Sequence, residues 1–323
     1  MIEECIQLQI DQAIDALAEG EVVVFPTETV YGIGVDSTNY EAVDRLFEVK
    51  QRPKDNPVTL HVSDVDMVKA VAYVTDDAQT LMADFWPGAL AIILEVKENT
   101  VSPNVNAGKK TVGFRLPDND IAKQLIAGLG KPVAGTSANV SGQLSSTSFK
   151  QVTEYFQDNV AAFIDGGPSQ IGIESTVIDL TTDVPTIIRP GSITKEQIEQ
   201  SIGKSIAEKT SDIAQKYAHY TVESDVLYGS ASDILASIDL LKEKNFGVLA
   251  SESTINQLPA ELAEKSLAIS DDIQEALSQL YSSIAEMNTH PDINGFVLET
   301  RLNDDSAFNN RVISVAQNQA LLH

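Results

Sequence analysis

The sequence predicts a two-domain protein of the α/β (α+β) class, in which a twisted mixed sheet with helices precedes a small three-layer α/β domain. Three observations predict this. The chain has 323 residues, of which 43% are hydrophobic and 21% charged, enough to bury two cores. Helical and strand-like segments alternate along it. A polar stretch divides the chain into two parts, in which the helical and strand-like segments follow different orders.

The part before the polar stretch begins with a helical pattern over residues 9–19, which ends at Gly20. A β-branched run over residues 21–25 then stops at Pro26. The other helices expected here are residues 40–49, 75–85 and 194–201. The other strands expected are residues 58–62, 89–96, 111–115, 132–134, 161–165, 175–180 and 186–188. So many strands with so few helices between them favour a mixed sheet over a strictly doubly wound one.

The second part of the chain follows residues 203–224, which are polar and lack apolar periodicity. The segments expected after them are a helix at 232–244, strands at 246–251 and 266–270, a helix at 272–287, a strand at 294–300 and a helix at 306–318. This order indicates a small three-layer domain. We therefore predict domains at 1–203 and 228–323, joined by a linker at 204–227.

Charge and composition exclude several classes of protein. With 47 acidic and 22 basic side chains the net charge is −25, which disfavours a general nucleic-acid binder. Basic residues nevertheless gather at Lys50, Arg52 and Lys54, where an anion could bind. Cys5 is the single cysteine and there are four histidines, so any metal is expected to arrive with a substrate. The sequence offers no apolar run of membrane-spanning length and no signal-peptide pattern, and we expect a cytoplasmic protein.

A first candidate site segment runs from Phe25 to Gly34 with the sequence F-P-T-E-T-V-Y-G-I-G. A buried strand here gives way to hydroxyls and glycines, which allow a ligand to approach the backbone closely. The segment matches neither a Walker P-loop nor a dinucleotide fingerprint. The alternative is a strand-end turn that merely requires Gly32 and Gly34.

A second segment, K-Q-R-P-K-D-N-P, runs from Lys50 to Pro57 directly after a predicted helix. Pro53 and Pro57 restrict the backbone, so Lys50 and Arg52 are presented from a stiff loop. Such cations suit the phosphates of a nucleotide, since arginine offers a planar fork and lysine a point charge. The alternative is an ordinary solvated basic loop.

Two further segments carry hydroxyl, amide and cationic groups at the ends of predicted strands. The segment G-T-S-A-N-V-S-G at residues 135–142 could donate several hydrogen bonds to one anion or sugar, although its residue types also suit an ordinary Asx or Ser turn. Ser175 in G-I-E-S-T-V and Arg189 in I-R-P-G end two neighbouring strands. Each of these signals is weak alone.

In this order and spacing the segments resemble the YrdC/Sua5 family of threonylcarbamoyl-AMP synthases. The shared motifs are P-T-E-T-V-Y-G, K-x-R-P, W-P-G at 86–88, R-x-P at 115–117, S-A-N-x-S-G, S-T-V and R-P-G. The Tyr217-Ala-His-Tyr220 segment and residues 228–323 are similar to the linker and C-terminal domain of the long Sua5 form. The resemblance implies a YrdC-like mixed sheet followed by a Rossmann-like domain.

The implied activity is condensation of L-threonine, bicarbonate or CO2, and ATP carrying Mg²⁺ into L-threonylcarbamoyladenylate and pyrophosphate. The product would pass to a downstream enzyme that completes N6-threonylcarbamoyladenosine (t6A) in transfer RNA. Carried over by motif, the residues that would face ATP are Lys50, Arg52, Asn56, Thr111, Ser137, Asn139, Ser145, Arg189 and Tyr220, with Lys50 and Arg52 as catalytic cations. Those that would hold threonine are Thr29, Tyr31, His61, Arg115, Ser137 and Ser175.

Other interpretations stay open at this point. His61 lies in an alternating strand and could be a structural histidine beneath the sheet. Asn119 stands where the family commonly has a histidine, near the presumed threonine end. The first domain could instead be an RNA-binding module with a basic groove and no catalysis, in which case it would bind transfer RNA without ATP. A third possibility is carbamoyl transfer to a protein partner, although the chain lacks the zinc-finger cysteines of such enzymes.

Overall fold

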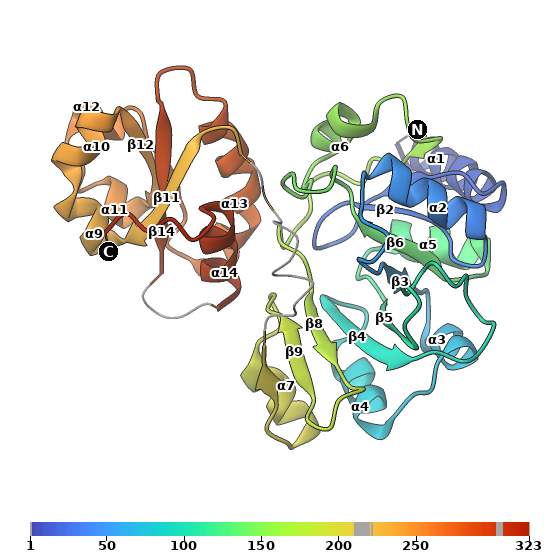
Figure 1. The fold of residues 1–323 in the computed structure, drawn as a ribbon. Coiled ribbons are helices and arrows are strands. Elements are labelled where there is room, and N and C mark those ends of the chain that lie inside the picture. The colour runs from blue at the N-terminus through green and yellow to red at the C-terminus, as the bar shows by residue number, and fades with distance from the viewer. Residues whose placement is uncertain (1, 210–219, 221, 302–305, 323) are drawn as a thin grey trace. The chain divides into compact units, whose positions relative to one another are not determined.

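The computed structural model describes residues 2–209, 220, 222–301 and 306–322. The chain divides into two compact units, which are described separately (Figure 1). The first comprises residues 1–141, 145–170 and 174–215, and the second comprises residues 216–323 with the short segments 142–144 and 171–173. In the described part of the chain no helix is both long and apolar enough to cross a bilayer.

The first unit contains a ten-stranded sheet with helices on both faces. Its helices are α1 (Ile2–Ala18), α2 (Tyr40–Val49), α3 (Val65–Val71), α4 (Asp76–Phe85), α5 (Asp120–Leu129), α6 (Phe149–Phe156) and α7 (Lys195–Ile202). Its strands are β1 (Val23–Phe25), β2 (Gly32–Asp36), β3 (Thr59–His61), β4 (Leu90–Glu95), β5 (Thr111–Arg115), β6 (Val133–Ser137), β7 (Ala162–Phe163), β8 (Thr176–Asp179), β9 (Thr186–Arg189) and β10 (Ala207–Glu208).

The strand order is β10-β9-β8-β4-β5-β3-β6-β2-β1-β7, with parallel and antiparallel neighbours. In the middle of the sheet β3 pairs parallel to β5, with His61 opposite Arg115, and antiparallel to β6, with Thr59 opposite Gly135. Since side chains alternate between the two faces of a strand, His61 and Arg115 project from the same face. The predicted mixed sheet is confirmed.

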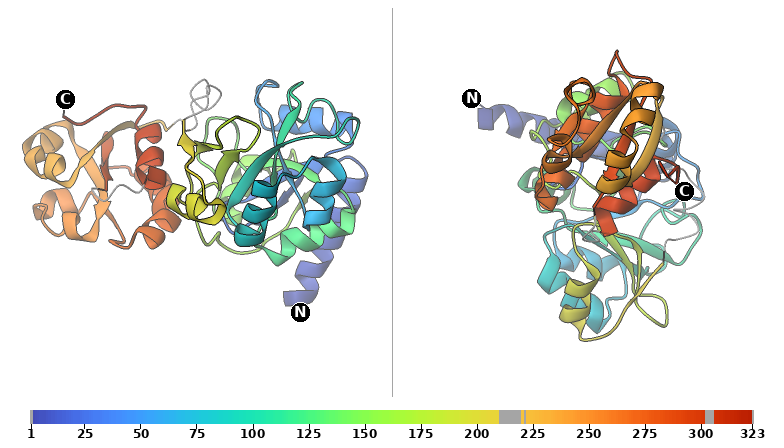
Figure 2. Two further views of the ribbon diagram at one scale, coloured as in Figure 1. Left: turned by 90° about the horizontal axis from the view of Figure 1, so that it is seen from below. Right: turned by 90° about the vertical axis from the view of Figure 1, so that its left-hand side faces the viewer.

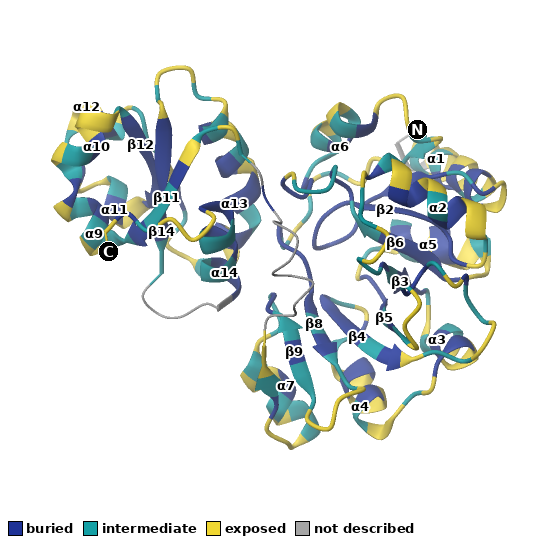
Figure 3. Cartoon of the chain, viewed as in Figure 1, coloured by how far each residue is buried: buried dark blue, intermediate teal, exposed yellow. Residues whose placement is uncertain are grey.

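The two faces of this sheet differ. One bears Leu60 and Phe114 and packs into the larger apolar core; buried residues are dark blue in Figure 3. The other bears Phe25 and Val133, which pack against α1 and α5 in a second core. These two helices lie side by side (Figures 1 and 2). Beyond the cover of these helices, the second face carries the polar residues of the candidate site.

Glycines on this second face make room for aromatic side chains. A Cβ on Gly32 would lie 2.7 Å from the ring of Phe25, and one on Gly135 would lie 3.3 Å from His61 Nδ1. The rings of Phe25 and His61 meet edge to face, with centroids 5.6 Å apart. The glycines therefore seat these two rings against the backbone of the sheet.

The second unit contains a four-stranded parallel sheet in the order β11-β14-β12-β13. Its strands are β11 (Asp225–Ser230), β12 (Phe246–Ser251), β13 (Leu267–Ile269) and β14 (Gly295–Thr300). Its helices are α9 (Ala231–Ala236), α10 (Ile238–Lys244), α11 (Glu252–Ile255), α12 (Ala260–Ala263), α13 (Ile273–Asn288) and α14 (Ser306–Val315). The parallel sheet with helices agrees with the small α/β domain expected from the sequence.

Several elements differ from the prediction. The single helix expected at 232–244 is wrong, because Ser237 leaves the helical conformation and divides α9 from α10. Strand β11 begins at Asp225, within the predicted linker. Most of the rest of that linker, including the Tyr217-Ala-His219 segment, lies outside the described residues. The elements that had not been predicted are β2, α3, α5, α6, β10, β11, α11 and α12.

Candidate active site

Lys50 lies at the C-terminal end of α2 and is 1% exposed. Its ammonium donates to the backbone oxygen of Ser137, to the backbone oxygen of Asn139 at 2.6 Å and to Asn139 Oδ1 at 3.5 Å. Burial, with a smaller contribution from the charge of Arg52, lowers the pKa of Lys50 well below its usual range. Lys50 therefore directly holds the S-A-N loop, which begins at Ser137, the last residue of β6.

Arg52 shapes the loop that follows α2. Its Nε donates to the backbone oxygen of Asn56 at 3.0 Å, and its Nη2 donates to Asn56 Oδ1 at 2.7 Å and to the backbone oxygen of Pro57 at 2.8 Å. Arg52 and Asn56, both predicted to face ATP, are thus hydrogen-bonded to each other. Both side chains are only partly buried, so a ligand could still reach them.

Arg115 at the end of β5 is a second cationic centre and is 5% exposed. Its Nη1 donates to Thr29 Oγ1 at 2.7 Å, and its Nε donates to the backbone oxygen of Gly88 at 3.3 Å. Its Nη2 lies 2.6 Å from Oε1 of Glu28, which is also buried. The P-T-E-T segment and the R-x-P motif, far apart in the sequence, therefore meet at one guanidinium.

His61 lies beside Arg115 on the neighbouring strand. Burial, and then the positive charge of Arg115, lowers the pKa of His61 to about 3. The imidazole is thus neutral at physiological pH. Its Nδ1 is buried and has no hydrogen-bond partner among the described residues. A neutral ring with one unused nitrogen can bind a ligand or pack under the sheet, so the prediction that His61 contacts threonine stays a prediction.

Tyr31 joins several of the motif segments through its backbone. Its N–H donates to the backbone oxygen of Ser146 at 2.9 Å, and its own oxygen accepts from the N–H of Ala138 at 2.7 Å. Its hydroxyl donates to the backbone oxygen of Gly167 at 2.7 Å. Burial raises the pKa of this phenol to about 12. These hydrogen bonds give Tyr31 a bracing role between loops.

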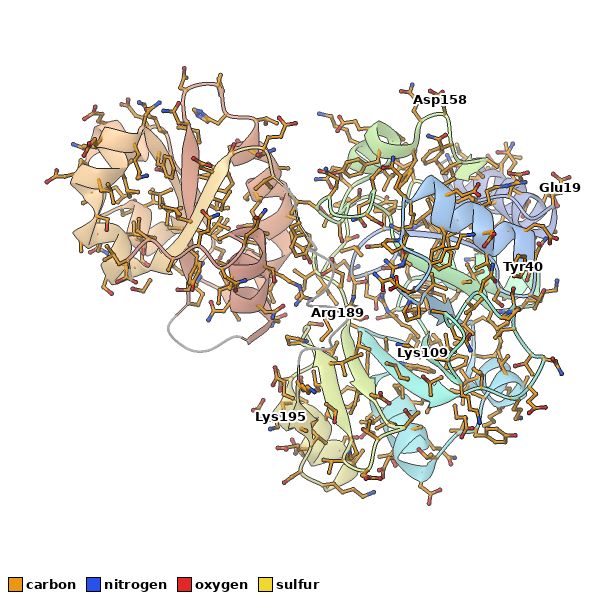
Figure 4. The ribbon with its side chains drawn as sticks, in the orientation of Figure 1. Glu19, Tyr40, Lys109, Asp158, Arg189 and Lys195 are labelled. Atoms are coloured by element: carbon orange, nitrogen blue, oxygen red, sulfur yellow. The ribbon has the colours of Figure 1, made fainter. Side chains whose placement is uncertain are left out.

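A third group of predicted residues lies around β8 and β9. Ser145 Oγ donates to Glu174 Oε1 at 2.5 Å. Arg189, labelled at the end of β9 in Figure 4, donates through Nε and Nη2 to the backbone oxygen of Ser175 at 3.0 and 2.8 Å. Its Nη2 also lies 3.2 Å from Ser175 Oγ. The serine and the arginine predicted at neighbouring strand ends are therefore hydrogen-bonded to each other.

The three groups are linked through short backbone connections. Tyr31 ties the P-T-E-T segment to the loops of Asn139 and Ser145, as described above. The W-P-G corner links Arg115 to β8, because Gly88 accepts from Arg115 and the neighbouring Ala89 accepts from the N–H of Thr176 at 3.0 Å. Most of the predicted site residues therefore belong to one connected region of the first unit.

Two predicted residues, Thr111 and Tyr220, lie outside this network of hydrogen bonds. Thr111 begins β5 on the same face as Arg115, about 13 Å away along the strand. Tyr220 belongs to the second unit, where it is 6% exposed and its hydroxyl is paired with that of Tyr281 on α13. The predicted contacts of Thr111 and Tyr220 with ATP stay predictions.

Two acidic residues of the region were missed by the sequence reasoning. Glu28 pairs with Arg115 and Glu174 pairs with Ser145, and each is at most 8% exposed. Both lie inside the quoted motifs, so an acid next to a buried strand was the available signal. Asn119, in contrast, caps α5 by accepting from the N–H of Ala122 at 3.1 Å, which accounts for a polar residue at that position.

Comparison with known proteins places this region in a family. The model described as telomere recombination, which covers the Sua5, YciO and YrdC proteins, matches residues 15–191. The chain belongs to the Sua5/YciO/YrdC family. A second model, described as the C-terminal domain of threonylcarbamoyl-AMP synthase, matches residues 193–314 of this Sua5-type chain. The predicted resemblance to the long Sua5 form is confirmed.

Relatives of this Sua5-type chain match along most of its length. Threonylcarbamoyl-AMP synthase of Bacillus subtilis is 42% identical over 257 residues, covering 76% of this chain and 74% of the relative. That of Pyrococcus abyssi is 36% identical over 290 residues, covering 84% and 83%. The solved structure of Pyrococcus abyssi Sua5 complexed with L-threonine superposes with a TM-score of 0.87 at 32% identity, covering 96% of this chain and 95% of that one.

Proposed function

We propose that this chain condenses L-threonine, bicarbonate or CO2, and ATP into L-threonylcarbamoyladenylate with release of pyrophosphate. The observation that carries the proposal is how two buried basic side chains meet the motif segments: Lys50 donates to the backbone oxygen of Asn139 in the S-A-N motif, and Arg115 donates to the hydroxyl of Thr29 in the P-T-E-T motif. The names of the Bacillus and Pyrococcus relatives, and the threonine bound to Pyrococcus Sua5, support it.

The threonine end of the proposed site is Arg115 with Thr29, His61 and Ser175. A guanidinium can bind the carboxylate of an amino acid with two parallel hydrogen bonds. Thr29 already accepts from Nη1 of Arg115, which fixes the plane of the guanidinium. A neutral His61 adds a polar group without further charge. In this arrangement the ligand carboxylate would be oriented before the carbamate forms on its amino group.

The nucleotide end is the surface formed by the loops of Arg52, Ser137 and Arg189. Carbamate and the α-phosphate are both anionic, so the enzyme must mainly position two groups that repel each other. Arg52 and Arg189 would stabilise the charge that develops on the departing pyrophosphate. Lys50 would hold the Ser137 and Asn139 loop in position for the nucleotide. This mechanism requires no covalent enzyme nucleophile.

Mg²⁺ enters this proposal as part of the ATP substrate. Among the described residues no group of three or more His, Cys, Asp or Glu side chains could hold a metal ion. The triphosphate itself supplies oxygen ligands that suit Mg²⁺, and the remaining positions of its octahedron are commonly filled by water. We therefore propose that the protein binds the complex of Mg²⁺ and ATP rather than a metal of its own.

The full-length protein tests the proposal directly. Incubated with ATP, Mg²⁺, bicarbonate and radiolabelled threonine, it should release pyrophosphate and form a labelled nucleotide only when all four are present. Release of pyrophosphate without threonine would contradict the proposed reaction. Because an adenylate of this kind is reactive, the product should be trapped by coupling it to a t6A-completing enzyme and transfer RNA.

The alternative of an RNA-binding module is weakened by where the predicted basic residues lie. Lys50 is buried, and Lys54 forms an ion pair with Asp44 at 2.8 Å. The basic window is therefore largely committed to the protein itself and leaves few free charges for a phosphate backbone. Salt-dependent affinity for transfer RNA in the absence of ATP would favour this alternative.

A further inference from the structure

Glu28 has an unusual environment for a charged side chain. It follows the buried strand β1, lies between two threonines and is 5% exposed. Its Oε1 lies 2.6 Å from Nη2 of Arg115. Among the described residues, however, neither carboxylate oxygen of Glu28 receives a hydrogen bond of satisfactory geometry, and Oε2 has no ion-pair partner. The ion pair is therefore buried but incompletely satisfied.

An arrangement of this kind is costly for a folded protein. A buried ion pair repays its desolvation only when further hydrogen bonds satisfy the remaining lone pairs and protons. The neighbouring hydroxyls donate elsewhere, since Thr27 Oγ1 donates to the backbone oxygen of Val30 at 2.6 Å and the hydroxyl of Thr29 therefore donates to Thr27 Oγ1 at 2.9 Å. Because carboxylate oxygens only accept, the group missing beside Glu28 is a hydrogen-bond donor.

We propose that Glu28 accepts a hydrogen bond from the α-amino group of L-threonine while Arg115 binds its carboxylate. This inference rests on the proposed function and names the group that recognises the amino end of the substrate. The threonine zwitterion would bind between Glu28 and Arg115, with its ammonium at the carboxylate of Glu28 and its carboxylate at the guanidinium of Arg115. A carboxylate accepts from an ammonium and from a neutral amine alike, so the contact can persist when the amine loses its proton for carbamate formation.

The arrangement makes Glu28 a specificity-determining residue. A ligand with a carboxylate but no amino group would satisfy Arg115 and leave the charge of Glu28 buried and unpaired. Such a ligand is opposed by the site rather than merely bound less well. The site should therefore select an α-amino acid over the same acid without its amino group, before any chemistry takes place.

Calorimetric titration of the full-length protein without ATP tests this selectivity. The two ligands are L-threonine and β-hydroxybutyrate of the same β-configuration, which is threonine without its α-amino group. The wild-type protein should prefer threonine by at least about 100-fold. In Glu28→Gln the ratio of the two affinities should fall to about tenfold or less, because the amide no longer carries the charge that opposes the deamino ligand. This ratio does not depend on the fraction of protein that is folded.

Two control variants isolate the effect. Glu174→Gln makes the same change at the other buried acid of the region and should leave the ratio unchanged. Arg115→Lys should weaken both ligands and keep most of the preference. If Glu28→Gln does not fold, Glu28→Asp takes its place, since the shorter side chain should lower the ratio at least severalfold.

The possible outcomes separate this inference from the proposed function. A wild-type protein that does not bind threonine overturns both. A wild-type protein that binds threonine, with the same ratio in the Glu28 variant or with an equal fall in Glu174→Gln, overturns the inference alone. A fall confined to the Glu28 variants supports it.

Discussion

The ammonium of Lys50 lies 2.6 Å from the backbone oxygen of Asn139, in a setting where the lysine is 1% exposed. The K-x-R-P motif suggests a direct phosphate ligand, but the three hydrogen bonds of the Lys50 ammonium are directed at the loop of residues 137–139. In the proposed mechanism Lys50 would therefore act on a nucleotide indirectly, by fixing this loop. The loop and the lysine form a single unit.

Replacing Lys50 tests this coupling. Lys50→Met removes the donor and leaves buried carbonyl groups of Ser137 and Asn139 without it, so the free energy of unfolding should fall by about 2–4 kcal/mol. Urea denaturation measures the change. Lys54→Met, at the exposed lysine of the same loop, is the matched control and should leave the urea midpoint nearly unchanged. Equal effects of the two substitutions would show that Lys50 is not a structural element of the loop.

Arg52 should matter more for turnover than for stability. Arg52→Ala removes a cation at the proposed pyrophosphate end and should lower the rate of pyrophosphate release at least about 100-fold. The loss of its hydrogen bonds to Asn56 and Pro57 should cost only about 1 kcal/mol, since the loop is partly exposed. Arg45→Ala, at an exposed arginine on α2, should leave the rate unchanged. Retained turnover in Arg52→Ala would remove Arg52 from the proposed mechanism.

The low pKa of His61 predicts a specific pH dependence of stability. The unfolded chain binds a proton at His61 below about pH 6.5, whereas the folded protein does so only below about pH 3. Between these values the unfolded state is favoured as the pH falls, by up to about 1.4 kcal/mol per pH unit. Denaturation of wild type and His61→Gln at several pH values should show a shallower loss in the variant. Parallel curves would contradict a buried, neutral histidine.

Glycines in the sheet should differ in their tolerance of a methyl group. In Gly135→Ala the new Cβ would lie 2.9 Å from the backbone oxygen of Ile33, so the free energy of unfolding should fall by about 1–3 kcal/mol. Gly113, on the same face of the sheet, is the control, because a Cβ there comes no closer than 3.5 Å to Thr59 Oγ1. Thermal unfolding of the two variants checks the difference, and a more stable Gly135→Ala than Gly113→Ala would refute it.

Elements with strong local patterns were predictable from the sequence. The helix at 40–49 and the strands at 111–115 and 246–251 have the bounds that were predicted. Strand β2 was missed because Gly32 and Gly34 are poor strand formers, and the strand exists because β1 and β6 pair with it on both sides. Helix α5 was missed although Asn119 and Gly130 cap its two ends.

The composition of the candidate site was predictable, but its pairing was not. Polar motifs at strand ends indicated Lys50, Arg115 and Arg189 individually. Which acceptor each cation meets depends on pairings between distant parts of the chain, and local spacing carries no information on these. Glu28 shows this limit of sequence-based prediction most clearly. It lies within the P-T-E-T motif, but its partner Arg115 belongs to a distant strand, so the ion pair is visible only in the folded structure.

The register in which His61 lies opposite Arg115 also limits how the length of this chain can change. Deleting one residue of β5 ahead of Phe114 would move Phe114 and Arg115 each to the opposite face of the sheet, placing an aromatic ring at the polar face and a guanidinium in the apolar core. An insertion of two residues would preserve the faces but move the guanidinium about 7 Å along the strand. Indels should therefore be tolerated in exposed connecting loops, such as residues 181–184, and be inactivating within β3 and β5.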